Sequence, residues 1–216
     1  SSSGMLNSAR KGVMDYVDSV DNSDIIITAG HPLATAGANT IPMPFGMLRE
    51  LEAISGVRSV DPFRKLYMTI SGKRVLLEAF DAESWPRHNT CTVIEGSVND
   101  IPLMRGRNEV LINEIIATRM GLKRGDTMEL PTPDGPKPFK VSAVIVSYAS
   151  DSGVMLMDIQ TYERHWNDHV ADMFSIYVRP GHDIAAVRTA IQDHCELNLS
   201  TVLLRRLYFE GEIESV

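Results

Sequence analysis

The chain has 216 residues, of which 44% are hydrophobic, and its formal net charge is -7 at pH 7. This apolar content is sufficient for a packed core in one large domain or in two small lobes. The negative net charge argues against a nucleic-acid-binding surface, which normally gathers Lys and Arg. No apolar run approaches the roughly 18–20 residues that span a bilayer. Ser1 to Gly4 lack the basic head and the apolar core of a signal peptide.

The first part of the chain predicts a helix, a strand and a long loop. Apolar residues recur at three- and four-residue steps from Met5 to Val20, which predicts an amphipathic helix, and the β-branched run Asp24–Thr28 predicts a strand. The connection from Ala29 to Phe45 is long enough to be either functional or disordered. Its apolar tip is a candidate contact with a substrate or partner, although these side chains could instead fold back onto the core. The tip consists of Pro42, Met43, Pro44 and Phe45.

A helix over Gly46–Ile54 and a strand over Val57–Val60 follow. Alternating apolar residues then predict a hairpin, with strands at Leu66–Ile70 and Val75–Phe80 and a turn at Ser71-Gly72-Lys73. The order is therefore strand, helix, strand and hairpin.

The same order returns near the C-terminus. Phe174–Val178 predicts a strand, Asp183 caps a predicted helix, and Glu196–Val202 predicts another strand. Two strand–helix–strand units that flank a hairpin predict a split βαβ, ferredoxin-like lobe. We therefore predict an α+β fold with residues 24–81 and 172–202 in this lobe, and residues 82–171 in an inserted, mostly β second lobe.

The segment from Arg107 to Ile145 has the most distinctive pattern. Its apolar strand ends at Asn113, whose side chain can cap the following helix, and Gly121 can end that helix in the left-handed conformation. A turn with Gly125-Asp126 and a strand–loop–strand follow. The predicted elements are the strand Val110–Ile112, the helix Glu114–Met120, the strand Thr127–Leu130, the loop Pro131–Pro138 and the strand Phe139–Ile145.

Taken together, this segment resembles the extracytoplasmic (periplasmic) core domain of MacB/FtsX-like permeases of ABC transporters. The resemblance rests on a strand that ends in Asn, an early helical Ala, Gly-Leu, a basic residue before Gly-Asp, and a closing strand that begins with Phe. These positions are Asn113, Ala117, Gly121-Leu122, Gly125-Asp126 and the segment Phe139–Val144. Ala143 departs from the pattern, because the family usually has Gly there. The likeness extends weakly from about Asp24 to about Val202.

The resemblance implies a porter-like lobe that carries an inserted lobe, on the extracytoplasmic face of the bacterial cytoplasmic membrane. It implies that residues 1–23 form a stalk helix from a first membrane helix, and that residues 203–216 return towards the membrane as a second helix. The membrane helices themselves would then be absent from this excised piece. The implied work is non-catalytic coupling of ATP-driven helix motion to a substrate or partner outside the membrane.

The implied partners are an ABC ATPase subunit or domain and a second permease copy. A periplasmic adaptor, a lipoprotein, a lipid or a cell-wall enzyme is a further possible partner, and the sequence does not choose among them. The chain has no Gly-x-x-x-x-Gly-Lys-Ser/Thr loop, so it should not hydrolyse ATP through a P-loop. We expect no cofactor and no catalytic residue.

Two other function classes stay open at this stage. His165 and His169 are four residues apart, so on a helix they would share a face at metal-ligand spacing, as in a metal-dependent hydrolase. No Glu follows His165, as the zinc-protease motif requires, and a solvated helix face is the preferred interpretation. The second alternative is a stand-alone binding domain.

Asp151-Ser152-Gly153 is similar to the loop of aspartic proteases, but those enzymes need two such carboxylates facing each other. The triplet is also a common turn sequence, which is the reading we prefer. Cys91 and Cys195 are the two cysteines of the chain, and we expect them to be unpaired because they fall in different predicted lobes.

Overall fold

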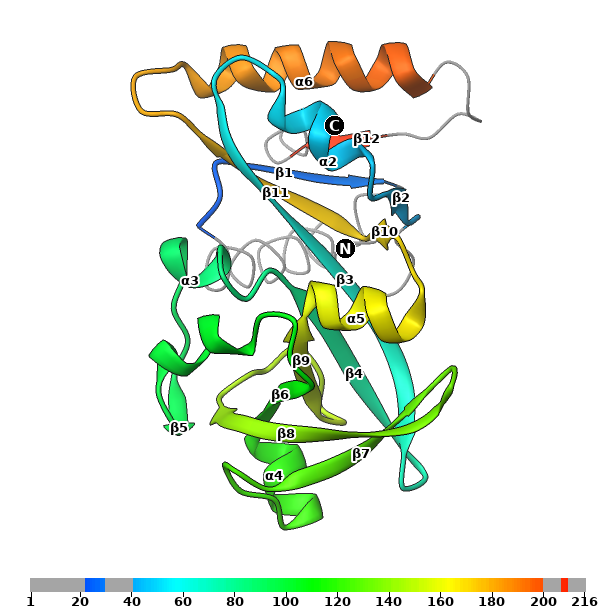
Figure 1. Cartoon of the computed structure of the whole chain (residues 1–216). Coiled ribbons are helices and arrows are strands. Elements are labelled where there is room, and N and C mark those ends of the chain that lie inside the picture. Colours follow the sequence, from blue (N-terminus) through cyan, green and yellow to red (C-terminus); the bar gives the residue numbers. More distant parts are fainter. Residues whose placement is uncertain (1–21, 30–40, 200–206, 210–216) are drawn as a thin grey trace, which may run out of the picture. The chain divides into compact units, whose positions relative to one another are not determined.

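Residues 22–29, 41–199 and 207–209 are described in a computed structural model of the chain. The chain folds into two compact units, whose elements are labelled in Figure 1. Unit 1 takes the residues up to Pro62 and those from Val170 onward, and unit 2 takes Phe63–His169.

Unit 1 contains two strand–helix–strand segments that are far apart in the sequence. Its strands lie in the order β12-β1-β11-β3, and β1 is antiparallel to both β11 and β12. This is the order of a split βαβ sheet, in which each helix connects two strands that are separated by a third. The described elements are β1 (Ile25–Ala29), β2 (Met43–Pro44), α2 (Met47–Glu52), the first part of β3 (Val57–Ile70), β10 (Val170–Ala171), β11 (Met173–Val178), α6 (Ile184–Leu199) and β12 (Leu207–Phe209).

The core of unit 1 lies between its sheet and the helices α2 and α6 (Figure 1). Ile27 of β1 and Ile176 of β11 are fully buried against Leu51 of α2 and Ile191 of α6. Residues at three- and four-residue steps lie on one helix face, which explains why the apolar positions of α6 meet the sheet. Gly56 has φ +90°, and a Cβ at this position would lie 2.7 Å from a methyl group of Val187. Glycine therefore allows the chain to enter β3 close beneath α6.

Most of the elements predicted for unit 1 are confirmed. The strands predicted at Asp24–Thr28 and Phe174–Val178 correspond to β1 and β11, and the helix predicted from Gly46 corresponds to the shorter α2. Two predictions are wrong: residues 196–199 continue α6 instead of starting a strand, and residues 207–209 form β12 instead of part of a return helix. Residues 1–21 of the predicted stalk helix lie outside the described residues.

Unit 2 is built around a mostly β sheet. From β3 its strands follow the order β3-β4-β9-β6-β8-β5, and β7 pairs with β8 alongside this path. The β4–β9 and β6–β8 pairs are parallel, and the other pairs with a described register are antiparallel. The described elements are the rest of β3, β4 (Lys73–Phe80), α3 (Trp85–His88), β5 (Val93–Glu95), the 3₁₀ turns η2 (Val98–Asp100) and η3 (Pro102–Met104), β6 (Glu109–Asn113), α4 (Glu114–Met120), β7 (Thr127–Thr132), β8 (Gly135–Ile145), β9 (Val154–Asp158) and α5 (Ile159–Trp166).

The two hairpins of unit 2 are tighter than the sequence suggests. The hairpin at Ser71-Gly72 is confirmed, and both turn residues have positive φ, as a two-residue type I′ turn requires. However, β3 is a single 14-residue strand that continues through Pro62, where two separate strands were predicted. The predicted loop Pro131–Pro138 is also wrong, because β7 and β8 pair up to Thr132 and Gly135 and leave a two-residue turn.

The boundaries of the compact units differ from the predicted lobe boundaries. The sequence prediction placed the β3–β4 hairpin in the first lobe, with the change at residues 81 and 82. In the structure β4 pairs in parallel with β9 from Leu76–Val154 to Phe80–Asp158, so the hairpin belongs to unit 2. The pair of strands that is split by the insertion is therefore β3 and β11.

Candidate functional site

The residues of the sequence signature around Asn113 have structural roles. Asn113 is fully buried, and its Oδ1 accepts hydrogen bonds from the backbone N–H groups of Ile116, 3.2 Å, and Val154, 3.1 Å. Its Nδ2 donates to the carbonyl oxygen of Ser147 at 3.2 Å. One amide side chain thus caps α4 and ties it to β9 and to the segment after β8. Because these bonds occupy both ends of the amide, Asn113 is a structural residue.

The Gly-Asp turn of the signature is held by backbone pairing with β8. Gly125 has φ +91° and donates to the carbonyl oxygen of Val141 at 2.8 Å. Val141 donates in turn to the carbonyl oxygen of Asp126 at 2.8 Å, and the Asp126 carboxylate accepts from the backbone N–H of Lys123. The Gly is needed for its left-handed backbone, and the Asp closes the turn.

The basic residue before Gly-Asp joins three parts of unit 2. Arg124 donates from Nε to the carbonyl oxygen of Ser142 at 3.2 Å, and its guanidinium contacts the carboxylate of Asp100 at 3.0 Å. Its backbone N–H donates to the carboxylate of Glu95 at 2.9 Å. A Cβ at Gly96 would lie 3.2 Å from this side chain and 3.0 Å from Cβ of Ala143, the residue that departs from the family pattern.

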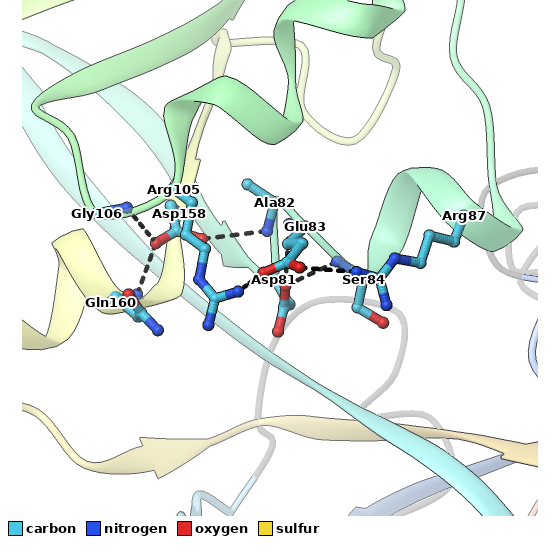
Figure 2. A network of polar contacts seen from close by, with 9 residues as sticks. All are labelled: Asp81, Ala82, Glu83, Ser84, Arg87, Arg105, Gly106, Asp158 and Gln160. Carbon is cyan, nitrogen blue, oxygen red and sulfur yellow. Dashed lines mark hydrogen bonds and ion pairs between the residues drawn. The ribbon is translucent and has the colours of Figure 1, made fainter.

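A second polar network, which the sequence analysis missed, surrounds Asp158 at the end of β9 (Figure 2). Asp158 is 1% exposed and accepts hydrogen bonds from the backbone N–H groups of Ala82, Gly106 and Gln160 at 3.0–3.1 Å. Its bond to Gln160 caps α5. An Asp that directly follows an apolar strand run and precedes a helix is the sequence signal that could have identified this cap.

The acidic residues next to this network also have structural partners. The Asp81 carboxylate accepts from the backbone N–H groups of Glu83 and Ser84 at the start of α3. Glu83 contacts the guanidinium groups of Arg87 and Arg105 (Figure 2). These carboxylates therefore order the connection that leads from β4 through α3, and each faces N–H donors or guanidinium groups.

The two histidines do not share the helix face that the metal alternative required. α5 ends at Trp166 and Asn167 takes the left-handed conformation, so His169 lies beyond the helix. Nε2 of His165 lies 2.8 Å from Oδ1 of Asn108, whereas His169 contacts Glu163 and Asn167. Burial, together with the charges of Arg164 and Lys137, holds the pKa of His165 below its ordinary value.

Within the described part of the chain, no group of three or more His, Cys, Asp or Glu residues is placed to hold a metal ion. The premise of the hydrolase alternative, two histidines on one helix face, is wrong because α5 ends before His169. Cys91 and Cys195, both in described segments, are not joined by a disulfide.

The Asp-Ser-Gly triplet forms a turn before β9. The hydroxyl groups of Ser150 and Ser152 are 2.8 Å apart, and Arg119 donates to the carbonyl oxygen of Ser152. Asp151 is exposed, and Gly153 has φ +114°. These contacts agree with the preferred turn interpretation.

The candidate contact segment at the end of the long connection is partly buried. Met43 is 1% exposed and belongs to the core of unit 1, so its side chain is not available to a partner. Pro44 is exposed, and Pro42 and Phe45 are half-buried. The short strand β2 pairs with β10 through Met43–Ala171 and Pro44–Val170, which fixes this segment against unit 1.

The sequence of this chain is similar to that of a known permease protein. No protein-family model matches the chain. The sequence is 24% identical over 191 residues to an uncharacterized ABC transporter permease protein of Mycobacterium tuberculosis. The match covers 87% of this chain but only 22% of that relative's length.

Solved structures with a similar fold include domains of two transporter proteins and of a permease protein. The periplasmic region of MacB from Actinobacillus actinomycetemcomitans matches with a TM-score of 0.60 and 12% identity, over 95% of this chain and 99% of that one. The extracellular domain of the ABC-type transporter YknZ from Gram-positive bacteria matches with a TM-score of 0.54 and 14% identity, over 80% and 95%. A domain of a permease protein from Porphyromonas gingivalis matches with a TM-score of 0.50 and 16% identity, over 87% and 88%.

No helix in the described segments is both long and apolar enough to cross a membrane. The sequence similarity to a permease and the fold similarity to the domains of MacB, YknZ and a permease protein agree with the expectation from the Asn113 and Gly125-Asp126 signature. This chain has the α+β fold of the extracytoplasmic domains of MacB-like ABC transporter permeases.

Proposed function

We propose that this chain is the extracytoplasmic domain of an ABC transporter permease, and that it couples ATP-driven motion of membrane helices to a substrate or partner outside the membrane. The sequence similarity to a permease and the MacB-like fold support this class. In this role the ATPase is a separate domain or subunit, and the domain itself carries out no chemistry. Its partner on the membrane side is the ATPase, reached through membrane helices that flank the domain.

The observation that carries the proposal is the pairing of β1 and β12, the first and last strands among the described residues of unit 1. β1 and β12 are antiparallel neighbours, with Ile27 opposite Phe209 and Ala29 opposite Leu207. Because the strands run in opposite directions, the chain enters β1 at the same end of the pair at which it leaves β12. A domain suspended between two membrane helices needs this arrangement, since both connections lead to one bilayer.

The buried polar networks of unit 2 also support a mechanical role. Asn113, Asp158 and Arg124 each join three segments of the unit, and the hydrogen bonds of Asn113 and Asp158 are buried or partly buried. Satisfied polar networks make a fold rigid. A rigid unit transmits a displacement applied at one end, whereas a loosely packed one absorbs it.

Pro44, with the half-buried Pro42 and Phe45, stays our candidate for a contact with a partner. The pairing of β2 with β10 holds this segment in place, which would present the exposed proline in a fixed position. Binding residues carried by loops on a rigid scaffold are common. Met43 serves as the anchor of the segment in the core.

The test uses the full-length permease with its ATPase in lipid nanodiscs. Spin labels are placed at exposed helix positions, Ala186→Cys in α6 and Thr118→Cys in α4, after Cys91 and Cys195 have been replaced. We expect the distribution of distances between the labels to change when a non-hydrolysable ATP analogue binds. A control pair within unit 2, at Thr118 and Lys140, should give the same distances with and without nucleotide.

An ATPase variant that cannot bind nucleotide should abolish the change. Identical distance distributions for the Ala186–Thr118 pair in the presence and absence of the analogue would contradict the coupling role. A full-length gene product without flanking membrane helices would contradict the permease assignment itself.

A further inference from the structure

The chain passes between the two units at two peptide bonds, Pro62–Phe63 and His169–Val170, which we call the crossings. The first crossing lies inside the strand β3, and the second is followed directly by β10. The ladder between β3 and β4 starts at the pair Phe63–Phe80, and β10 starts at Val170. The crossings therefore contain no flexible linker, and any relative motion of the units has to be taken up by a few backbone dihedral angles.

On the side of unit 2, the two crossings are tied together by a polar cluster. Arg64 lies two residues after Pro62, and Asp168 lies two residues before Val170. Nε of Arg64 donates to Oδ2 of Asp168 at 3.0 Å, and the Tyr162 hydroxyl donates to the same oxygen at 2.5 Å. We call Arg64, Asp168 and Tyr162 the clamp.

Arg64 and Tyr162 belong to β3 and α5, and Asp168 follows the end of α5. Arg64 pairs with Ala79 in the β3–β4 ladder, which fixes its backbone. Tyr162 of α5 is 1% exposed, and its ring stacks on Trp166 with a centroid distance of 5.3 Å. Asn167 ends the helix in the left-handed conformation, and Asp168 follows it directly in the sequence.

The opposite charges of Arg64 and Asp168 compensate each other in partly buried surroundings. The side chains of Arg64 and Asp168 are 18% and 22% exposed, so water screens their interaction only in part. Burial and the hydrogen bond to Asp168 raise the pKa of the Tyr162 hydroxyl above its ordinary value, which is itself well above neutral pH, so the hydroxyl is protonated and can donate. Removing one partner of such a pair leaves the other charge uncompensated.

We infer that the clamp fixes the spacing of the two crossings and so restricts the two units to rotation about one axis. Two points that are fixed in both bodies define a single axis of rotation, whereas crossings that can move apart allow the units to twist as well. Hinges are usually a few residues that absorb dihedral changes, and the φ of Pro62 is already locked by its ring. The inference deepens the coupling role proposed above, because a single-axis hinge would transmit the displacement of a membrane helix in one direction. The use of the hinge in transport rests on that proposed role.

The experiment is carried out on the 216-residue chain without ATPase or membrane, so the clamp and the proposed function can fail independently. Distances between spin labels at Ala186 and Thr118 are compared in the parent chain, Arg64→Met, Asp168→Asn and the double variant. We expect each single variant to broaden the distance distribution at least 1.5-fold. Because both partners act as one unit, the double variant should broaden it no further.

Arg87→Met is the control, since it also removes an ion pair of unit 2, that of Arg87 on α3 with Glu83, which is not part of the clamp. It should leave the distribution unchanged. Hydrogen exchange provides a second readout, with faster exchange expected in peptides that cover residues 60–66 and 167–171 in the clamp variants. Asp168→Asn keeps the shape of the side chain, so it tests the clamp even where Arg64→Met does not fold. Unchanged width and exchange in folded Asp168→Asn, or equal broadening in Arg87→Met, would overturn the inference.

Discussion

At the scale of single residues, Glu78 stands out as a carboxyl group in the interior of a sheet. It lies on β4 with 7% of its surface exposed, opposite Lys65 on β3 and beside Leu156 on β9. Burial raises its pKa from 4.5 to about 7, against the opposing effect of the Lys65 charge. Near neutral pH the folded protein therefore holds a carboxyl group that is partly protonated, whereas the unfolded chain exposes an ionised one.

The resulting prediction is that stability falls as the pH rises. The contribution of Glu78 is fully present below its unfolded pKa of 4.5 and is lost as the pH rises through the folded value of about 7. The loss should reach about 3 kcal/mol, since each unit of pKa difference corresponds to about 1.4 kcal/mol. Glu78→Gln cannot ionise, so its free energy of unfolding should lack this change when urea unfolding is measured at pH 5 and pH 8.

Glu129→Gln is the control for this measurement, because Glu129 is exposed on β7. It should keep the pH dependence of the parent chain. If Glu78→Gln shows the same difference between pH 5 and pH 8 as the parent, then Glu78 is not the group responsible.

Residues whose role depends on near neighbours could be identified from the sequence, and residues whose role depends on distant strands could not. The cap at Asn113 was predicted because its helix follows directly. Glu78 gives no such signal, since its burial arises from the pairing of β4 with β3 and with β9, some eighty residues further on. The same reason explains why Asp158 was missed: two of its three donors come from other segments.

At the scale of elements, prolines were the main source of error. Pro136 and Pro138 suggested a loop, yet both lie in β8. The pairing of β8 with β6 begins at Lys140, so this first part of β8 pairs with β7 on one side. Proline lacks the N–H donor and is tolerated where that position of the strand faces an unpaired edge.

The helix end that a glycine marks was predicted, whereas the ends of α5 and α6 were missed. Gly121 ends α4 with φ +65°, as expected. Asn167 ends α5 in the same left-handed conformation, and because Asn is the usual alternative to Gly at this position, the sequence did contain a signal against a shared histidine face. The alternation of apolar and polar residues from Glu196 to Leu199 indicated a strand, but these residues continue the apolar spacing of Ile191 and Cys195 in α6.

The turn before β9 allows a test of how closely two elements pack. A Cβ at Gly153 would lie 2.6 Å from Cγ1 of Ile116 on α4, and the backbone there has φ +114°. Gly153→Ala should therefore combine backbone strain with overpacking and lower the free energy of unfolding by about 3 kcal/mol. Urea unfolding monitored by circular dichroism measures this difference.

Gly72→Ala is the matched control for this turn. Gly72 also has positive φ, at +75°, but a Cβ there would meet no atom within 4 Å. Its cost should be about 1 kcal/mol, from the backbone alone. Equal losses in the two variants would show that the contact between Gly153 and Ile116 contributes nothing.

At the scale of the whole molecule, the split βαβ unit was predicted correctly from the repeated order of strand, helix and strand. The extent of the insertion could not be predicted in the same way, because the β3–β4 hairpin is local in sequence and could belong to either unit. The parallel pairing of β4 with β9 assigns it to unit 2, and no local pattern reports a pairing over so long a separation. Two divisions of the chain are therefore to be compared, one at residues 62 and 170 and the other at residues 81 and 172.

Two deletion variants distinguish these divisions. In the first, a short Gly/Ser linker joins Pro62 to Val170, and in the second it joins Asp81 to Asp172. The first should fold, because β3 and β11 are neighbours in the sheet, where strands lie about 5 Å apart, and the core around Leu51 and Ile191 stays intact. The second keeps β4 without β9 and exposes Val75 and Leu77, which are 2% and 1% exposed in the whole chain. We expect it to aggregate or to unfold at least 10 °C lower, as measured by circular dichroism and size-exclusion chromatography. If the second variant proves the more stable of the two, the hairpin belongs with unit 1 and the division at Pro62 is wrong.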